Sequence, residues 1–261
     1  MKPELAPPHR RHLIGELFAA RDMLGAPGAI LRAAGKPKAE TQALRVMVFP
    51  GYGANDFSTA PLRYFLSKHG FRSEGWGLGL NTGGRGGAKR LDELSDRWEV
   101  DRTRETNGEA EVPGLIDRAS ERVAQRARET GDHYALLGWS LGGFIAREIA
   151  RDMPEEVATV ITMGSPVVGG PKYTSVAPLF RARNIDLDWV ESEIQKRFAK
   201  PITQPVTALY SKRDGIVGWP AAIDHDSPNV RHIELDVSHF GIGVNARAWD
   251  IVLDALLSAS P

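Results

Sequence analysis

The 261-residue sequence contains no cysteine, no excess of charge and no long apolar run. The lack of cysteine excludes disulfides, thiol nucleophiles and thiolate metal sites. Its 33 basic residues balance 33 acidic ones, so no net field attracts nucleic acid or an anionic membrane, and a small uncharged partner is expected. No apolar stretch is long enough to span a membrane, and the basic residues 1–11 are not followed by the apolar segment of a secretory signal. These absences favour a cytoplasmic protein. They do not determine how many subunits it forms.

The pentapeptide from Gly138 to Gly142 has the pattern Gly-Trp-Ser-Leu-Gly, between an apolar strand pattern and a helical one. In this context it predicts a nucleophile elbow, in which the serine sits on a strained turn and exposes its hydroxyl above the sheet. The following helix directs its free N–H groups toward the same point. Ser140 is therefore the candidate nucleophile, and the alternative is a glycine-rich turn with a capping serine.

A serine hydroxyl is a weak nucleophile at neutral pH, so this interpretation requires an acid and then a histidine later in the chain. Asp214 follows one apolar strand pattern, and His239 follows the next. These two residues are the candidate acid and base. Asp236 is the rival acid, but a carboxylate three residues from His239 on one loop is poorly placed to hold the imidazole from behind. The other histidines are expected to be solvated.

Acyl transfer also needs hydrogen-bond donors for a tetrahedral oxyanion. One is expected to be the backbone N–H of Leu141, directly after the nucleophile, and the other the N–H of Tyr52 in the loop that follows the first strong strand. An ordinary tight turn at Gly51 and Gly53 is the alternative for this loop. The glycines between 75 and 87 lack the spacing of a nucleotide-binding loop and are expected to form a loop beside the active-site edge.

Together these motifs resemble the α/β-hydrolase superfamily and, within it, the bacterial lipase-like esterases. The resemblance covers about residues 44–258 and rests on Pro50-Gly51-Tyr52-Gly53, Gly138-Trp139-Ser140-Leu141-Gly142-Gly143, Met163-Gly164-Ser165-Pro166, residues 211–217 and Ser238-His239-Phe240-Gly241. It implies an α/β-hydrolase fold and hydrolysis of carboxylic esters through an acyl-serine, without metal or cofactor. An acyltransferase with the same triad, or a non-catalytic relative that binds a small ligand, are the alternatives. This sequence departs from the family pattern at two places. Pro50 stands where many members have histidine, and residues 86–112 form a long charged stretch.

The chain is expected to form one α/β-hydrolase domain over residues 44–261, with a mostly parallel sheet and helices on both faces. Its pattern predicts strands at 45–49, 72–80, 134–137, 157–163, 206–210 and 230–235, and helices at 60–68, 115–129, after the elbow, and 246–257. Residues 1–43 form an N-terminal helical extension in this scheme. Two short amphipathic helices within 12–34 are expected to pack on the domain, or else to form an interfacial or dimerising arm.

Residues 167–204 lose strand periodicity and suggest two helices between two strands of the sheet. Enzymes of this architecture insert a cap at such a position, so a cap over the serine is expected, with a plain packed excursion as the alternative. Leu179, Phe180 and Trp189 in this segment are the candidate contacts for the acyl group of the substrate.

Overall fold

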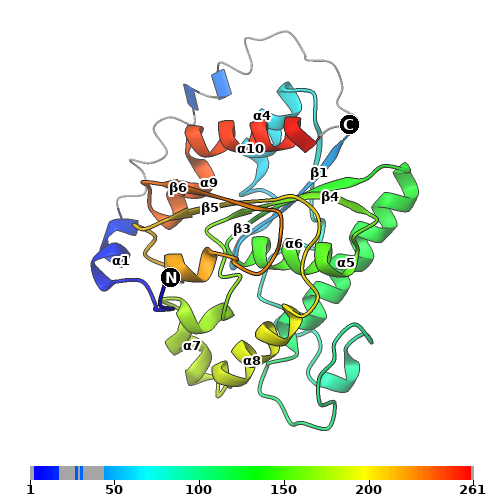
Figure 1. Ribbon diagram of the computed structural model, residues 1–261, viewed down its shortest axis with the longest axis vertical. Coiled ribbons are helices and arrows are strands. Elements are labelled where there is room, and N and C mark those ends of the chain that lie inside the picture. Colours follow the sequence, from blue (N-terminus) through cyan, green and yellow to red (C-terminus); the bar gives the residue numbers. More distant parts are fainter. Residues whose placement is uncertain (1–2, 18–26, 29, 32–43, 260–261) are drawn as a thin grey trace.

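The computed structural model describes residues 3–17, 27–28, 30–31 and 44–259, which form a parallel sheet covered by helices on both faces (Figure 1). The six strands are β1 (Arg45–Phe49), β2 (Arg72–Gly75), β3 (Tyr134–Trp139), β4 (Val157–Met163), β5 (Val206–Ser211) and β6 (Val230–Leu235). None of the helices in the described ranges is both long and apolar enough to cross a membrane.

The strands lie in the order β2-β1-β3-β4-β5-β6, and every neighbouring pair is parallel. The chain therefore leaves β1 toward β2 on one side and returns to β3 on the other. At such a switch point the loops after the two central strands diverge and leave a crevice at the carboxyl edge of the sheet. The loop after β1 and the turn after β3 border this crevice, and both carry predicted site residues.

Alternate residues of β1 enter two separate cores, as the two-residue period of a strand requires. Val46 and Val48 pack with α4 (Ala60–Lys68) and α10 (Ala246–Ala259), whereas Met47 and Phe49 pack with α5 (Glu111–Thr130) and α6 (Leu141–Asp152). All four strand residues are fully buried, which explains the unbroken apolar run of this strand. Figure 1 shows α4 and α10 on one face of the sheet and α5 and α6 on the other.

Strands predicted at 45–49, 157–163 and 230–235 and the helix at 60–68 are confirmed at their predicted bounds. The strand predicted over 72–80 is too long, because it ends at Gly75. There the Asp56 carboxylate accepts the N–H groups of Trp76 and Gly77 at 3.0 and 3.1 Å and turns the chain away. The short helix α9 (His239–Val244) is an addition to the predicted elements.

The segment between β4 and β5 holds the two predicted helices, α7 (Ala177–Ala182) and α8 (Leu187–Arg197), after the 3-10 turn η2 (Gly170–Tyr173). Two further 3-10 turns are η1 (Leu91–Glu93) and η3 (Trp219–Ala222). At the N-terminus, α1 (Arg10–Glu16) corresponds to the first predicted amphipathic helix. Most of the second predicted helix lies outside the described residues.

A buried carboxylate joins α6 to α8. The Glu148 side chain, about 2% exposed, lies 3.1 Å from the guanidinium groups of Arg147 and Arg151 and 2.5 Å from that of Arg197. Burial alone would raise the pKa of Glu148, but the three positive charges outweigh it and lower the pKa from 4.5 to about 2. The carboxylate is therefore ionised and anchors α8 to the helix that follows the elbow.

We expect Glu148→Gln to lower the free energy of unfolding by about 3 to 5 kcal/mol, because it leaves the buried Arg151 without its carboxylate partner, whereas Arg147 and Arg197 keep Asp224 and Asp152. Urea unfolding monitored by circular dichroism measures the change. Glu121→Gln, on the exposed face of α5, is the control and should stay within about 0.5 kcal/mol of the parent.

The same carboxylate makes stability depend on pH. Because the folded pKa is depressed, its contribution is complete above the unfolded value of 4.5 and is lost as the pH falls toward 2. Glu148→Gln should flatten this loss, and an unchanged acid unfolding curve would contradict the assigned ion pairs.

Candidate active site

Ser140 has a backbone conformation that L-residues rarely adopt, with φ 55° and ψ −125°. The turn is enforced by close backbone packing, because a Cβ at Gly138 would overlap the carbonyl of Gly142, and one at Gly142 would overlap that of Phe49. The Ser140 N–H donates to the Met163 carbonyl at 2.8 Å, and α6 begins at the next residue. The predicted strand, elbow and helix are therefore all present around this serine.

The structure brings Asp214 and His239 into direct contact. His239 Nδ1 lies 2.7 Å from Asp214 Oδ2, and both side chains are only 3% exposed. The other Asp214 oxygen accepts the N–H groups of Ile216 and Val217 at 2.8 and 2.7 Å, which fixes the carboxylate. Asp236, the rival acid, is 87% exposed and pairs with Arg213 at 3.5 Å. The geometry therefore favours Asp214 as the partner of the imidazole.

Burial of His239 lowers its pKa, but the Asp214 charge and hydrogen bond, with a smaller contribution from the Glu16 charge, outweigh burial, and the net pKa is raised above 6.5. The hydrogen bond at Nδ1 leaves Nε2 to act as a proton acceptor. The aromatic ring of Trp139 packs beside the imidazole with 5.7 Å between ring centroids, and its Nε1–H donates to the His239 carbonyl at 3.3 Å.

The loop after β1 lies directly beside the serine, since a Cβ at Gly51 would come within 3.3 Å of the Ser140 Cβ. Within the described part of the chain, the backbone N–H groups of Tyr52 and Leu141 have no hydrogen-bond acceptor. Free N–H groups beside a nucleophile are what an oxyanion requires. The two predicted donors thus flank Ser140 on separate elements.

Asn81 is a buried residue that the sequence analysis missed. Its side-chain amide donates to the Pro50 carbonyl at 2.8 Å, while its backbone carbonyl accepts from Gly53 at 2.7 Å and its N–H donates to Ala54 at 2.8 Å. These bonds hold the loop after β1 from both sides. Asn81 belongs to the glycine-rich segment predicted to lie beside the active-site edge, and the contacts confirm that position.

A cavity of about 330 Å³ opens above the serine, with Tyr52, Ser140, Leu141 and His239 in its wall. Phe180 and Trp189 of the cap segment also line it, but Leu179 does not and is 49% exposed. Neighbouring residues on a helix point about 100° apart, and on α7 this turns Leu179 toward solvent while Phe180 faces the cavity. The predicted substrate contact at Leu179 is therefore not supported by this geometry.

A second wall of the cavity comes from the charged stretch at 86–112, which departs from the α/β-hydrolase pattern. The start of α5 also contributes to this wall. The contribution of these segments is mainly apolar and comes from Leu91, Trp98, Val100, Val112 and Ile116. Two charged groups of this stretch also bind the cap segment. Arg104 pairs with Asp186 at 2.8 Å, and Glu111 pairs with Arg183 at 2.7 Å. The cavity is thus covered by two excursions that are joined to each other by ion pairs.

No protein-family model matches the chain. Over 104 residues it is 35% identical to a pimeloyl-[acyl-carrier protein] methyl ester esterase of Sodalis glossinidius, and the match covers 39% of this chain and 34% of that protein. The chain thus spans about one-third of that relative's length.

The similarity to solved structures extends over more of the chain than the match to this relative. A monoacylglycerol lipase of Paleococcus ferrophilus is similar with a TM-score of 0.55 and 14% identity, covering 85% of this chain and 97% of that one. A lipase-esterase related protein of Clostridium acetobutylicum gives 0.54 and 15%, covering 83% and 96%. The α/β-hydrolase fold predicted from the motifs is confirmed.

We expect Asp214→Asn to lower kcat roughly ten-thousand-fold, the loss typical when the partner of a catalytic imidazole can no longer hold the correct tautomer. A catalytic base must be neutral, so for His239 in this role we expect kcat/KM to fall as the pH drops below its raised pKa, above 6.5. In Asp214→Asn this acid limb should move to lower pH, because the Asp214 charge no longer raises the pKa of His239 and burial lowers it.

Initial rates of p-nitrophenyl butyrate hydrolysis between pH 5 and 9 test both effects. Asp236→Asn is the control, since that side chain is exposed and pairs with Arg213. A larger loss in Asp236→Asn than in Asp214→Asn would show that the acid is misassigned.

Proposed function

We propose that this chain is a serine hydrolase that cleaves carboxylic esters through an acyl-serine intermediate. One observation carries the proposal: the strained Ser140 and the His239 imidazole, which is paired with the buried Asp214, border the same mainly apolar cavity. Their order along the chain, serine, acid and histidine, is the order of this fold class.

In the proposed mechanism, Ser140 Oγ attacks the ester carbonyl carbon while His239 Nε2 accepts its proton. Asp214 holds the Nδ1–H and stabilises the imidazolium. The N–H groups of Tyr52 and Leu141 donate to the negatively charged oxygen of the tetrahedral intermediate. Collapse of the intermediate breaks the ester C–O bond, and His239 returns the proton to the departing alcohol. Water, activated by His239, then releases the acid and restores Ser140.

The walls of the cavity support an uncharged ester with an apolar acyl group as substrate. The names of the sequence relative, an esterase, and of the structural neighbours, lipases and esterases, support the same reaction class. A domain over 44–261 with a cap at about 167–204, an N-terminal extension over 1–43 and a cytoplasmic location belong to the same proposal, and the balanced charge argues against a nucleic-acid partner.

Ser140→Ala should abolish hydrolysis of p-nitrophenyl esters, because no other nucleophile replaces its hydroxyl. A fluorophosphonate probe should add its mass to the peptide that contains Ser140, as read by tandem mass spectrometry. Ser165→Ala, a buried serine at the end of the neighbouring strand, is the control and should still be labelled. Label found only on another peptide would exclude Ser140 as the nucleophile.

Hydrolysis and acyl transfer share the acyl-serine, and their products distinguish them. With a lipid ester and added alcohol, a hydrolase gives mainly the free acid, whereas an acyltransferase gives the new ester. Chromatography of the products at matched conversion separates the two activities.

The cap residues should determine acyl-chain preference. Phe180→Ala and Trp189→Ala should each shift the ratio of kcat/KM for long against short p-nitrophenyl esters by about 1 to 3 kcal/mol, roughly 10- to 200-fold, since each removes an apolar contact with the chain. Leu179→Ala, on the same helix as Phe180 but outside the cavity, is the matched control and should leave the ratio unchanged. An unchanged chain-length profile in the first two folded variants would assign the cap a purely structural role.

A further inference from the structure

Glu16 is the last residue of α1, a helix that is separate from the helices covering the sheet. Its buried carboxylate nevertheless lies next to the loops that carry Asp214 and His239. Its side chain, 9% exposed, accepts three backbone hydrogen bonds. Oε1 accepts from Gly215 at 2.8 Å and from His239 at 2.7 Å, and Oε2 accepts from Phe240 at 3.1 Å. One carboxylate thus reaches two loops that are separated by more than twenty residues.

These three donors lie at the base or directly beside the acid and the base. Gly215 directly follows Asp214, and His239 and Phe240 are the first two residues of α9. The first N–H groups of a helix lack partners within the helix, and a carboxylate is favourable there. Glu16 therefore binds the backbone at His239 itself and at the neighbour of Asp214.

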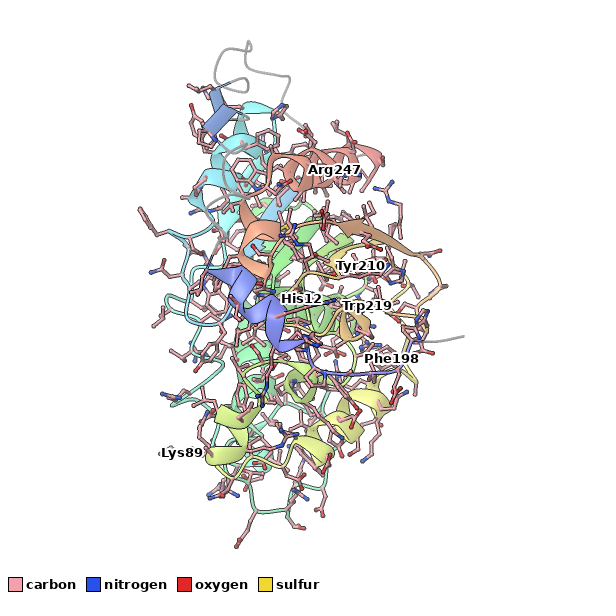
Figure 2. The ribbon with its side chains drawn as sticks, turned by 90° about the vertical axis from the view of Figure 1, so that its left-hand side faces the viewer. His12, Lys89, Phe198, Tyr210, Trp219 and Arg247 are labelled. Atoms are coloured by element: carbon pink, nitrogen blue, oxygen red, sulfur yellow. The ribbon has the colours of Figure 1, made fainter. Side chains whose placement is uncertain are left out.

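The N-terminal segment approaches these loops too closely for side chains to intervene. A Cβ at Gly215 would overlap the carbonyl of His12, and one at Gly218 would overlap that of Ala6. Figure 2 shows α1, with His12, between α9 above it and α7 below it, and Figure 1 shows the same neighbours from the side. The close approach of α1 and of the residues before it thus explains the glycines at 215 and 218.

We propose that Glu16 is a positioning residue, which holds the His239 backbone and the Asp214 loop in register so that the imidazole meets both the carboxylate and Ser140. This inference rests on the proposed function. Two carboxylates act on His239, Asp214 from the loop after β5 and Glu16 from α1, whereas the rings packed beside it, Trp139 and Phe240, are uncharged. Removal of the Glu16 charge therefore makes the imidazole less basic.

Two variants of the full chain separate geometry from charge. Glu16→Ala removes all three acceptors, and we expect kcat to fall about 10- to 100-fold, the size of effect that a small misplacement produces. Glu16→Gln keeps the volume and can still accept at one oxygen, but its NH2 group cannot accept from Phe240. Glu4→Gln, an exposed glutamate in the same N-terminal segment, is the matched control with unchanged kinetics.

Three measurements are made on each folded variant: kcat and KM for p-nitrophenyl butyrate, the pH profile of kcat/KM, and the titration of the His239 imidazole by NMR. The imidazole resonance is assigned by its loss in His239→Gln. A positioning role predicts a lower kcat with KM changed by less than about twofold, and an acid limb and a His239 titration midpoint that both move to lower pH in Glu16→Gln.

A merely structural role would lower the unfolding temperature and leave kcat and the His239 titration unchanged, and this result would overturn the proposal. The NMR titration also separates the two hypotheses. If the parent protein hydrolyses no ester, the proposed function fails, yet a lowered His239 midpoint in Glu16→Gln would still support the link between Glu16 and His239.

Discussion

The structure depends on the absence of side chains where the backbone passes beneath Ser140. Gly138 and Gly142 allow the end of β3, the start of α6 and the end of β1 to touch one another. Because these segments are in contact, the serine stands at the switch point of the sheet, with the loop after β1 on one side and the loops after β5 and β6 on the other. A Cβ at either glycine would separate the strands and with them every group that surrounds the serine.

The buried Asp214–His239 pair is held within this frame by hydrogen bonds to the carboxylate and within the loops that carry the two residues. The second carboxylate oxygen accepts two N–H groups, the Ser211 hydroxyl donates to the Val237 carbonyl at 2.6 Å, and Ser238 caps α9. In a buried site such bonds are strong, and an unpaired group is costly. The charge and hydrogen bond of Asp214 thus make the imidazole more basic in spite of its burial, and the bonds that fix the carboxylate also fix the direction of the imidazole.

The sequence predicted what depends on neighbouring residues. Apolar runs marked the strands, glycine spacing marked the elbow, and the ends of strands located Asp214 and His239. It missed Asn81 and Glu16, because their partners are far away along the chain: Glu16 bonds to Gly215 and to His239 across about two hundred residues. Leu179 shows a different limit, since the pattern predicted a helix but could not tell which face of that helix meets the cavity. The charged stretch at 86–112 was noted only as a departure, although its few apolar residues form a wall of the cavity.

The chemistry and its control come from different parts of the chain. The sheet and its turns bring Ser140, Asp214 and His239 together, and structures with 14 and 15% identity share this architecture. The cavity above the serine is instead built from two excursions joined by Arg104–Asp186 and Arg183–Glu111, and α8 is tied back to α6 through Glu148. Charged contacts thus hold the segment over the serine in place, while the loops that carry Asp214 and His239 are held from outside the sheet by α1. The residues proposed to set substrate preference and the basicity of the imidazole therefore lie in segments outside the elbow and its strands.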